Sequence, residues 1–166
     1  MSFSPVPKAS FPALTNITVE FLEKWGITFL MLDLDNTIAP YGQEEPTRDI
    51  ISWAEDMRER GIELFIVSNS RRPERVEAFA TALGIGYIKA AGKPSPRGVL
   101  QSLEVKNEKP EESALIGDQV YTDVLAANRA GVFSIVIEPI NLSNSLLTVR
   151  YWLEKPFRAM CKQKYQ

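Results

Sequence analysis

The sequence contains no histidine, which excludes Ser-His-Asp and Cys-His catalytic groups and the usual zinc sites built on imidazole ligands. It has a single cysteine, Cys161, so an internal disulfide framework is also excluded. No apolar run approaches the roughly 20 residues that cross a bilayer, and the N-terminal segment lacks the apolar centre of a signal peptide. We therefore expect a cytoplasmic protein whose chemistry depends on carboxylates and on cations that prefer oxygen ligands.

The chain has the length of one domain, since 166 residues lie close to the usual size of about 150. A Pro-rich stretch near the start predicts an N-terminal arm over residues 1–16, either a tail or a segment laid over the surface. Residues 17–140 form the predicted core. Residues 141–166 form a predicted basic, amphipathic tail.

Apolar runs alternate with helical patterns along the core. Helices are expected around residues 48–60, over 73–83, from Ser95-Pro96 toward Leu103, and from a cap at Thr122 to Gly131. The runs that we interpret as strands cover residues 26–32, 63–67, 87–88, 113–116 and 133–137. Short, continuously apolar strands that alternate with helices indicate parallel pairing with both sheet faces covered. The predicted fold is α/β, a three-layer doubly wound parallel sheet of about five strands.

Polar side chains follow four of these five strands, where each strand ends. Asp33 and Asp35 come first, and they share one side of the chain because side chains alternate along a strand. The later positions are Ser68-Asn69, Lys93, and the pair Asp118 and Asp123. An Asp at a strand end is often only a turn former, but the carboxyl ends of parallel strands meet at one sheet edge, where α/β proteins bind ligands.

Four carboxylates and one lysine would give this edge a formal charge of −3, which no phosphate could approach without compensation. Mg²⁺, which prefers carboxylate, water and phosphate oxygens, resolves the difficulty. With the metal bound, one Asp could attack phosphorus and a second could transfer the proton. Ser68 and Lys93 could hold the phosphate oxygens, with Asn69 and Thr37 shaping the loops around them.

The ordered set of motifs resembles that of the haloacid dehalogenase-like (HAD) phosphatases. The set is Asp33-x-Asp35-Asn36-Thr37, Ser68-Asn69, Lys93-Pro94 and Gly117-Asp118-x-x-x-x-Asp123. The resemblance implies that Asp33 is the nucleophile and Asp35 the acid/base, while Ser68 and Lys93 bind phosphate. It also implies a magnesium site at Asp118 with Asp123 nearby, and our predicted ligand set is Asp33, Asp35, Asp118 and Asp123.

Within that superfamily the chain is similar to the YqeG-type subfamily, in subfamily IIIA, and to the mitochondrial phosphatidylglycerophosphate phosphatases. The similar stretches are residues 32–38, 66–70, 93–94 and 116–124, and within the last of these Gln119 and Thr122-Asp123 are the more distinctive part. This similarity implies hydrolysis of the terminal phosphate of a lipid phosphate.

The spacing between motifs leaves no room for a large cap domain, because 32 residues separate Asp35 from Ser68 and 24 separate Ser68 from Lys93. An uncapped site favours a large substrate or a membrane-borne headgroup. Two alternatives stay open. One is a small soluble phosphate or a phosphoprotein as substrate, and the other is a non-catalytic docking role, for example toward a GTPase.

Apolar residues recur at helical spacing through the tail, from Val149 to Met160, and residues 150–166 carry a net charge of +4. This pattern is typical of a helix at an anionic membrane surface, but the same stripe could pack on the domain, and Pro156 could break the helix. Nucleic acid is not an expected partner, because the core is acidic. The sequence sets neither the oligomeric state nor the roles of Arg71, Arg72 and Arg97.

Overall fold

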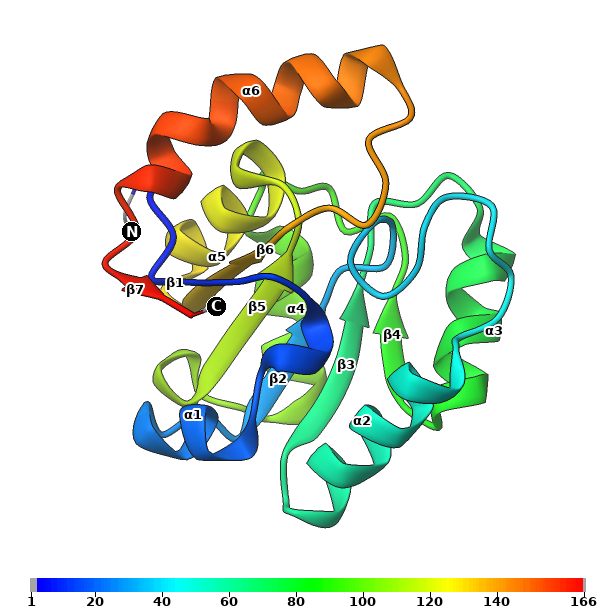
Figure 1. The fold of residues 1–166 in the computed structure, drawn as a ribbon. Coiled ribbons are helices and arrows are strands. Elements are labelled where there is room, and N and C mark those ends of the chain that lie inside the picture. Colours follow the sequence, from blue (N-terminus) through cyan, green and yellow to red (C-terminus); the bar gives the residue numbers. More distant parts are fainter. Residues whose placement is uncertain (1–2, 166) are drawn as a thin grey trace.

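The computed structural model describes residues 3–165, which form a parallel sheet with helices on both faces (Figure 1). The seven strands lie in the order β4-β3-β2-β5-β6-β1-β7. The strands are β1 (Ala9–Phe11), β2 (Phe29–Leu32), β3 (Glu63–Val67), β4 (Gly86–Ile88), β5 (Ser113–Gly117), β6 (Phe133–Ile137) and β7 (Gln163–Lys164). The predicted three-layer doubly wound α/β fold is confirmed, with seven strands in place of about five.

The two additional strands come from the ends of the chain. Strand β1 lies inside the predicted arm and pairs with β6, so that Ala9 is opposite Ile135. Strand β7 lies inside the predicted tail and pairs with β1. The ring of Phe11 stacks on that of Tyr165, with centroids 4.5 Å apart. Both terminal segments therefore contribute to the sheet, and the domain boundaries at residues 16 and 140 stay predictions.

The helices follow the predicted pattern over most of the core. Thr47 caps α2, its hydroxyl accepting from the Ile50 N–H, and Gly84 ends α3 with a φ of +64°, in the left-handed region that favours glycine. The helices are α1 (Val19–Lys24), α2 (Arg48–Glu59), α3 (Pro73–Leu83), α4 (Arg97–Lys106), α5 (Leu125–Ala130) and α6 (Ser145–Ala159). Short 3-10 turns, η1 (Leu14–Asn16) and η2 (Pro110–Glu112), precede α1 and β5.

The prediction that Thr122 caps the helix after β5 was wrong. A π-helical turn, η3 (Val120–Val124), precedes α5, and the Gln119 carbonyl accepts from both the Asp123 and the Val124 N–H groups. The Thr122 hydroxyl is instead directed to the Gln119 side chain at 3.3 Å. The predicted end of this helix at Gly131 is confirmed.

Two apolar layers enclose the sheet. One contains residues of α1, α2 and α3 with side chains such as Leu30, Leu32 and Ile66 of the central strands. The other contains residues of α4 and α5, packed against the alternate side chains Met31 and Phe65. Helix α6 lies across the top of the molecule in Figure 1 and contacts η3. Within residues 3–165, no helix is both long and apolar enough to span a membrane.

Candidate active site

Strand β2 places Asp33 at the carboxyl edge of the sheet, between β3 and β5. The Asp33 N–H donates to the Ile116 carbonyl at 2.9 Å, which prolongs the pairing of β2 with β5 by one residue. The chain then turns sharply, because the N–H groups of Ile38 and Ala39 both donate to the Leu34 carbonyl. Asn36, with a φ of +60°, takes the left-handed conformation that asparagine tolerates. The turn brings the Thr37 hydroxyl to 3.4 Å from Asp33 Oδ2, as expected for a residue beside the site.

Lys93 joins the first and the last motif. Its Nζ lies 2.6 Å from Asp33 Oδ1 and 2.6 Å from Asp123 Oδ1. All three side chains are buried. Burial opposes the ammonium charge, but the nearby carboxylates of Asp123 and Asp33 raise the pKa of Lys93 above its ordinary value. Lys93 is therefore charged at neutral pH and neutralises part of the acidic cluster.

Asp118 completes a group of three buried carboxylates. One oxygen from each of Asp33, Asp118 and Asp123 lies within 4.8 Å of the other two. Gly117 permits this arrangement, because a Cβ at that position would overlap the carboxyl group of Asp123. The Asp123 Oδ2 accepts from the Gln119 N–H at 3.1 Å, which fixes the turn around the cluster. The predicted meeting of acids from the first and fourth motifs is therefore present in the structure.

The cluster fits a divalent cation. The buried Asp118 Oδ1 has no hydrogen-bond partner among the residues described, and the Lys93 ammonium pairs with only two of the three carboxylates, those of Asp33 and Asp123. Burial, followed by the charges of Asp123 and Asp33, raises the pKa of Asp118 well above its ordinary value. Burial also raises the pKa of Asp33 to about 7, although Lys93 opposes the shift. A hard cation would favour the ionised form of these oxygen ligands, which suits Mg²⁺.

Asp35 stands apart from the three-carboxylate group. Its Oδ1 lies 2.5 Å from Arg75 Nη1, whose side chain is buried on α3. Arg75 also donates to the carbonyls of Pro40 and Gln43, so it ties the loop after the first motif to α3. The structure therefore does not place the Asp35 carboxylate with the other three predicted ligands. No hydrogen bond joins its Oδ2 to another side chain within residues 3–165.

Arg75 is one residue of this site that the sequence analysis did not identify, and including it changes the expected local charge from −3 to −2. The sequence did carry a signal of its burial, because Arg75 precedes Phe79 by four residues and so shares the buried face of α3. In the structure the Arg75 guanidinium lies 5.1 Å from the centre of the Phe79 ring. A buried charge needs a partner, and Asp35 is the partner that the fold supplies.

The second motif lies beside Lys93. The Asn69 side chain donates to the Lys93 carbonyl at 2.8 Å and accepts from the Lys93 N–H at 3.0 Å. Ser68 is fully buried, and its hydroxyl accepts from the Ser70 N–H at 3.0 Å. Asn69 thus joins the second and third motifs, as its predicted loop-shaping role requires, while a direct contact of Ser68 with phosphate stays a prediction.

Asp33, Asn69, Lys93 and Asp123 line a cavity of about 690 Å³, whereas Ser68 and Asp118 do not line it. Of the three arginines whose roles the sequence left open, Arg71 and Arg72 line this cavity and Arg97 does not. Arg72 is paired with Glu44 at 2.7 Å, whereas Arg71 has no acidic partner within residues 3–165. Arg150, from the N-terminal half of α6, is a further cation at the mouth that sequence reasoning did not assign to the site. The mouth is therefore basic, although the floor is acidic.

The pKa values predict how metal-free protein responds to pH. The folded pKa of Asp33 lies above its ordinary value of 3.8, so the folded chain binds more protons than the unfolded chain between about pH 4 and pH 7. Stability should therefore fall as pH rises through this range, and we expect the melting temperature in EDTA to be roughly 5–10 °C lower at pH 8 than at pH 5. Differential scanning fluorimetry over this range measures the change.

Mg²⁺ should offset this loss, so it should raise the melting temperature more at pH 8 than at pH 5. Asp118→Asn should remove most of the Mg²⁺-dependent shift, whereas Asp56→Asn on the exposed face of α2 should retain it. An Mg²⁺ response at pH 8 that Asp118→Asn leaves unchanged would contradict the assignment of this cluster as the cation site.

Comparisons with known proteins agree with this arrangement. The family model of the haloacid dehalogenase-like hydrolases matches residues 14–131. The chain is 36% identical over 133 residues to a "Probable phosphatase YqeG" of Bacillus subtilis, which covers 80% of this chain and 77% of that protein. It is 29% identical over 147 residues to the chloroplastic phosphatidylglycerophosphate phosphatase 1 of Chlamydomonas reinhardtii. That match covers 83% of this chain but only 54% of the algal protein, so the chain spans about half of its length.

A similar solved structure is the 3-deoxy-D-manno-octulosonate 8-phosphate phosphatase of Moraxella catarrhalis, in complex with magnesium, phosphate and KDO. It superimposes with a TM-score of 0.60 at 18% identity, over 90% of this chain and 83% of that one. At this identity the likeness shows the shared fold.

Proposed function

Because the chain belongs to the haloacid dehalogenase-like hydrolases, we propose that it is a Mg²⁺-dependent phosphomonoester hydrolase that forms an aspartyl phosphate on Asp33. We propose further that its substrate is a lipid phosphate such as phosphatidylglycerophosphate. One observation carries the chemistry: Asp33 lies at hydrogen-bonding distance from the ammonium of Lys93, in a buried group with two further carboxylates, and Asp35 follows two residues later.

In the first half of the reaction, a carboxylate oxygen of Asp33 attacks phosphorus and the ester P–O bond breaks. Asp35, held by Arg75 through Oδ1, gives its proton to the departing alkoxide. In the second half, Asp35 takes a proton from water, the water oxygen bonds to phosphorus, and the bond from Asp33 to phosphorus breaks. Inorganic phosphate leaves and both carboxyl groups return to their starting states.

Lys93 would hold the transferring phosphoryl group in line with Asp33 and neutralise part of its charge. Asp33, Asp118 and Asp123 are the residues that would hold Mg²⁺. The bound cation supplies charge neutralisation, which lets an anionic substrate approach an acidic floor. Asn69 keeps the loop that carries Lys93 in register with the second motif.

Three observations support a lipid substrate. The match to a phosphatidylglycerophosphate phosphatase covers most of this chain. Residues 3–165 contain no cap domain over the cavity, so a headgroup can enter while its acyl chains remain outside. Arg71 and Arg150 at the mouth suit the second phosphate, the phosphodiester, of such a headgroup.

The direct test is phosphate release from vesicles that contain phosphatidylglycerophosphate, with and without Mg²⁺, beside release from p-nitrophenyl phosphate. Release from both substrates supports the whole proposal. Release from p-nitrophenyl phosphate alone supports the phosphatase and rejects the lipid substrate. No Mg²⁺-dependent release from either substrate rejects the proposed chemistry.

Arg71 should affect lipid turnover specifically. We expect Arg71→Ala to raise KM for phosphatidylglycerophosphate about 5- to 30-fold, which corresponds to roughly 1–2 kcal/mol for one charge-assisted contact. The kcat and the hydrolysis of p-nitrophenyl phosphate should change little, because Arg71 is exposed and forms no ion pair with the carboxylate cluster within residues 3–165. The matched control is Arg97→Ala, an exposed arginine outside the cavity. Equal effects of Arg71→Ala on both substrates would contradict this role.

A further inference from the structure

The outer face of α6 is apolar and exposed. Trp152 is 62% exposed and Leu153 is 61% exposed. The complete stripe, which we call the α6 outer face, consists of Leu146, Val149, Trp152, Leu153, Pro156 and Met160. These positions follow helical spacing, so they form one continuous band along the outside of the helix. In Figure 1 no helix or strand within residues 3–165 lies outside α6.

The inner face of the same helix is polar, which reverses the usual arrangement. Glu154 is 1% exposed, and its carboxylate accepts from the Tyr121 N–H in η3. Arg158 is also buried, and it donates to the carbonyls of Ile137 and Asp118. Phe157 supplies an apolar contact, packing against a cluster that includes Val120. Hydrogen bonds from Glu154 and Arg158 therefore hold α6 in one orientation, with its apolar side toward solvent.

An exposed apolar band of this kind requires a partner, because isolated surface residues are common but a contiguous stripe marks a contact site. Within residues 139–165 the only acidic residue is Glu154, which is buried. The exposed charges of this segment are all positive and include Lys155, Lys162 and Lys164. The Lys155 ammonium lies 3.6 Å from the centre of the Trp152 ring, at the edge of the α6 outer face. The stripe is therefore apolar at its centre and cationic at its margin.

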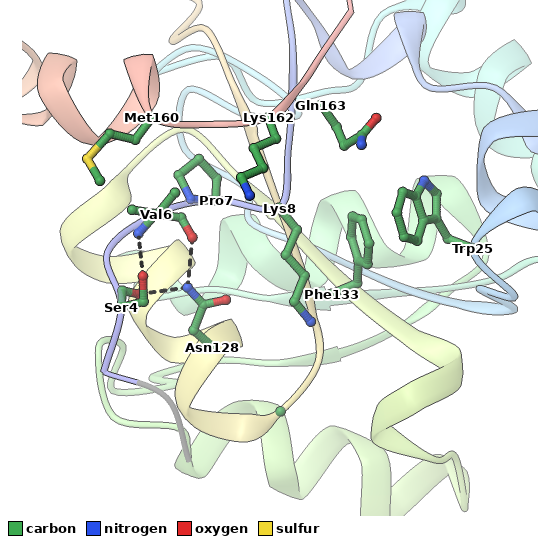
Figure 2. Close-up of a pocket in the computed structure, with 11 residues that line it drawn as sticks. Ser4, Val6, Pro7, Lys8, Trp25, Asn128, Phe133, Met160, Lys162 and Gln163 are labelled. Carbon is green, nitrogen blue, oxygen red and sulfur yellow. Dashed lines mark hydrogen bonds between the residues drawn. The ribbon is translucent and has the colours of Figure 1, made fainter.

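Both ends of the α6 outer face meet hollows in the surface. Leu146, at the first end, also lines the cavity that contains Asp33, Lys93 and Asp123. Met160, at the other end, lines a groove of about 750 Å³ between the N-terminal segment and the start of β6. Figure 2 shows that groove, with Lys8, Lys162, Trp25 and Phe133 around it. No acidic side chain lines the groove, so the apolar and basic character continues beyond the helix.

We propose that the α6 outer face docks the protein on an anionic lipid bilayer. Bilayer insertion suits a band of apolar side chains on one convex helix, with a tryptophan and lysines at the level of the headgroups. The cationic margin complements anionic lipid, and no acidic side chain of this segment opposes it. Since Leu146 belongs to both surfaces, docking places the catalytic mouth beside the headgroups. That last step rests on the proposed function, whereas docking itself does not.

The test is flotation of the full chain with vesicles of phosphatidylcholine alone or with about one third phosphatidylglycerol. We expect binding to the anionic vesicles that is weaker at high salt and weaker still on neutral vesicles. Trp152→Ser with Leu153→Ser should reduce the partition coefficient by at least about tenfold, because it removes two inserted apolar side chains. The matched control is Leu100→Ser with Val105→Ser, two exposed apolar residues on α4, which should bind like the unchanged protein.

The α6 double variant should retain its Mg²⁺-dependent hydrolysis of p-nitrophenyl phosphate, because neither residue lines the catalytic cavity. Absence of binding to anionic vesicles, or equal losses in the two double variants, would overturn the proposal. So would a dimer that the α6 substitutions split while vesicle binding is unchanged, since a second copy would then cover the stripe. Vesicle binding without any phosphatase activity would leave docking intact and reject the proposed function, so the two failures can be told apart.

Discussion

Asp33→Asn should abolish phosphate release, lowering kcat by about 10⁴-fold or more on every substrate that the protein hydrolyses. The amide has nearly the shape of the carboxylate but cannot attack phosphorus, so no aspartyl phosphate forms. The fold should persist, because Lys93 retains Asp123 at 2.6 Å. Single-turnover quenching with the unchanged enzyme should trap phosphate on the chain, and the variant should trap none.

The matched control is Asp56→Asn on α2, where the carboxylate is exposed and far from the cavity lining. It should leave kcat unchanged. Retention of most activity in Asp33→Asn would contradict the nucleophile assignment. If a cell that lacks this protein were rescued by Asp33→Asn, the non-catalytic docking role would be favoured instead, because that role needs only the shape of the molecule.

The residues of the site could be predicted because a parallel sheet converts positions far apart in sequence into neighbours. Asp33, Lys93 and Asp118 each follow an apolar run, and the carboxyl ends of such runs meet at one edge. Their contacts could not be predicted in the same way. The separation of Asp35 from the metal cluster depends on Arg75, which reaches the site from α3 across 40 residues of chain. The sequence pattern of α3 shows its apolar face but does not show which partner lies opposite.

Helix α6 shows a second limit of sequence pattern. The periodic stripe from Val149 to Met160 predicts an amphipathic helix, and a soluble domain usually turns the apolar side inward. In α6 the polar side faces inward instead, because Glu154 and Arg158 form hydrogen bonds with backbone groups of η3 and β6. Pro156 does not break the helix, which continues to Ala159. The side of a helix that faces the core depends on the element packed against it, so the sequence of the helix alone does not predict that side.

Lys93→Met should produce the largest loss of stability at the site. It removes the ammonium that lies between Asp33 and Asp123, and breaking a buried pair in this way lowers the free energy of unfolding by about 3–5 kcal/mol. We expect this loss at pH 8 in EDTA, measured by urea unfolding. Turnover should also fall by roughly 10²- to 10³-fold even with Mg²⁺, because a charge that faces the transferring phosphoryl group is missing.

The pH dependence separates this effect from a simple packing defect. The pKa of Lys93 is raised above its ordinary value of 10.5, so the ammonium stays charged between pH 5 and pH 8. The stabilisation that comes from this raised pKa is complete below pH 10.5 and is lost only at higher pH. The Asp33 carboxyl does titrate between pH 5 and pH 8, since burial raises its pKa to about 7. At pH 5 the Asp33 carboxyl is largely protonated and needs no cation, so Lys93→Met should destabilise the protein much less than at pH 8.

The control for this experiment is Lys106→Met, which removes the lysine of a partly exposed pair with Glu63. Its effect should stay below about 1 kcal/mol at both pH values. A loss in Lys93→Met that is the same at pH 5 and pH 8 would indicate that the methionine disturbs packing, not charge. A loss that grows with pH and shrinks when Mg²⁺ is added would mean that the lysine and the metal ion balance the same three carboxylates, since either cation can then compensate in part for the other.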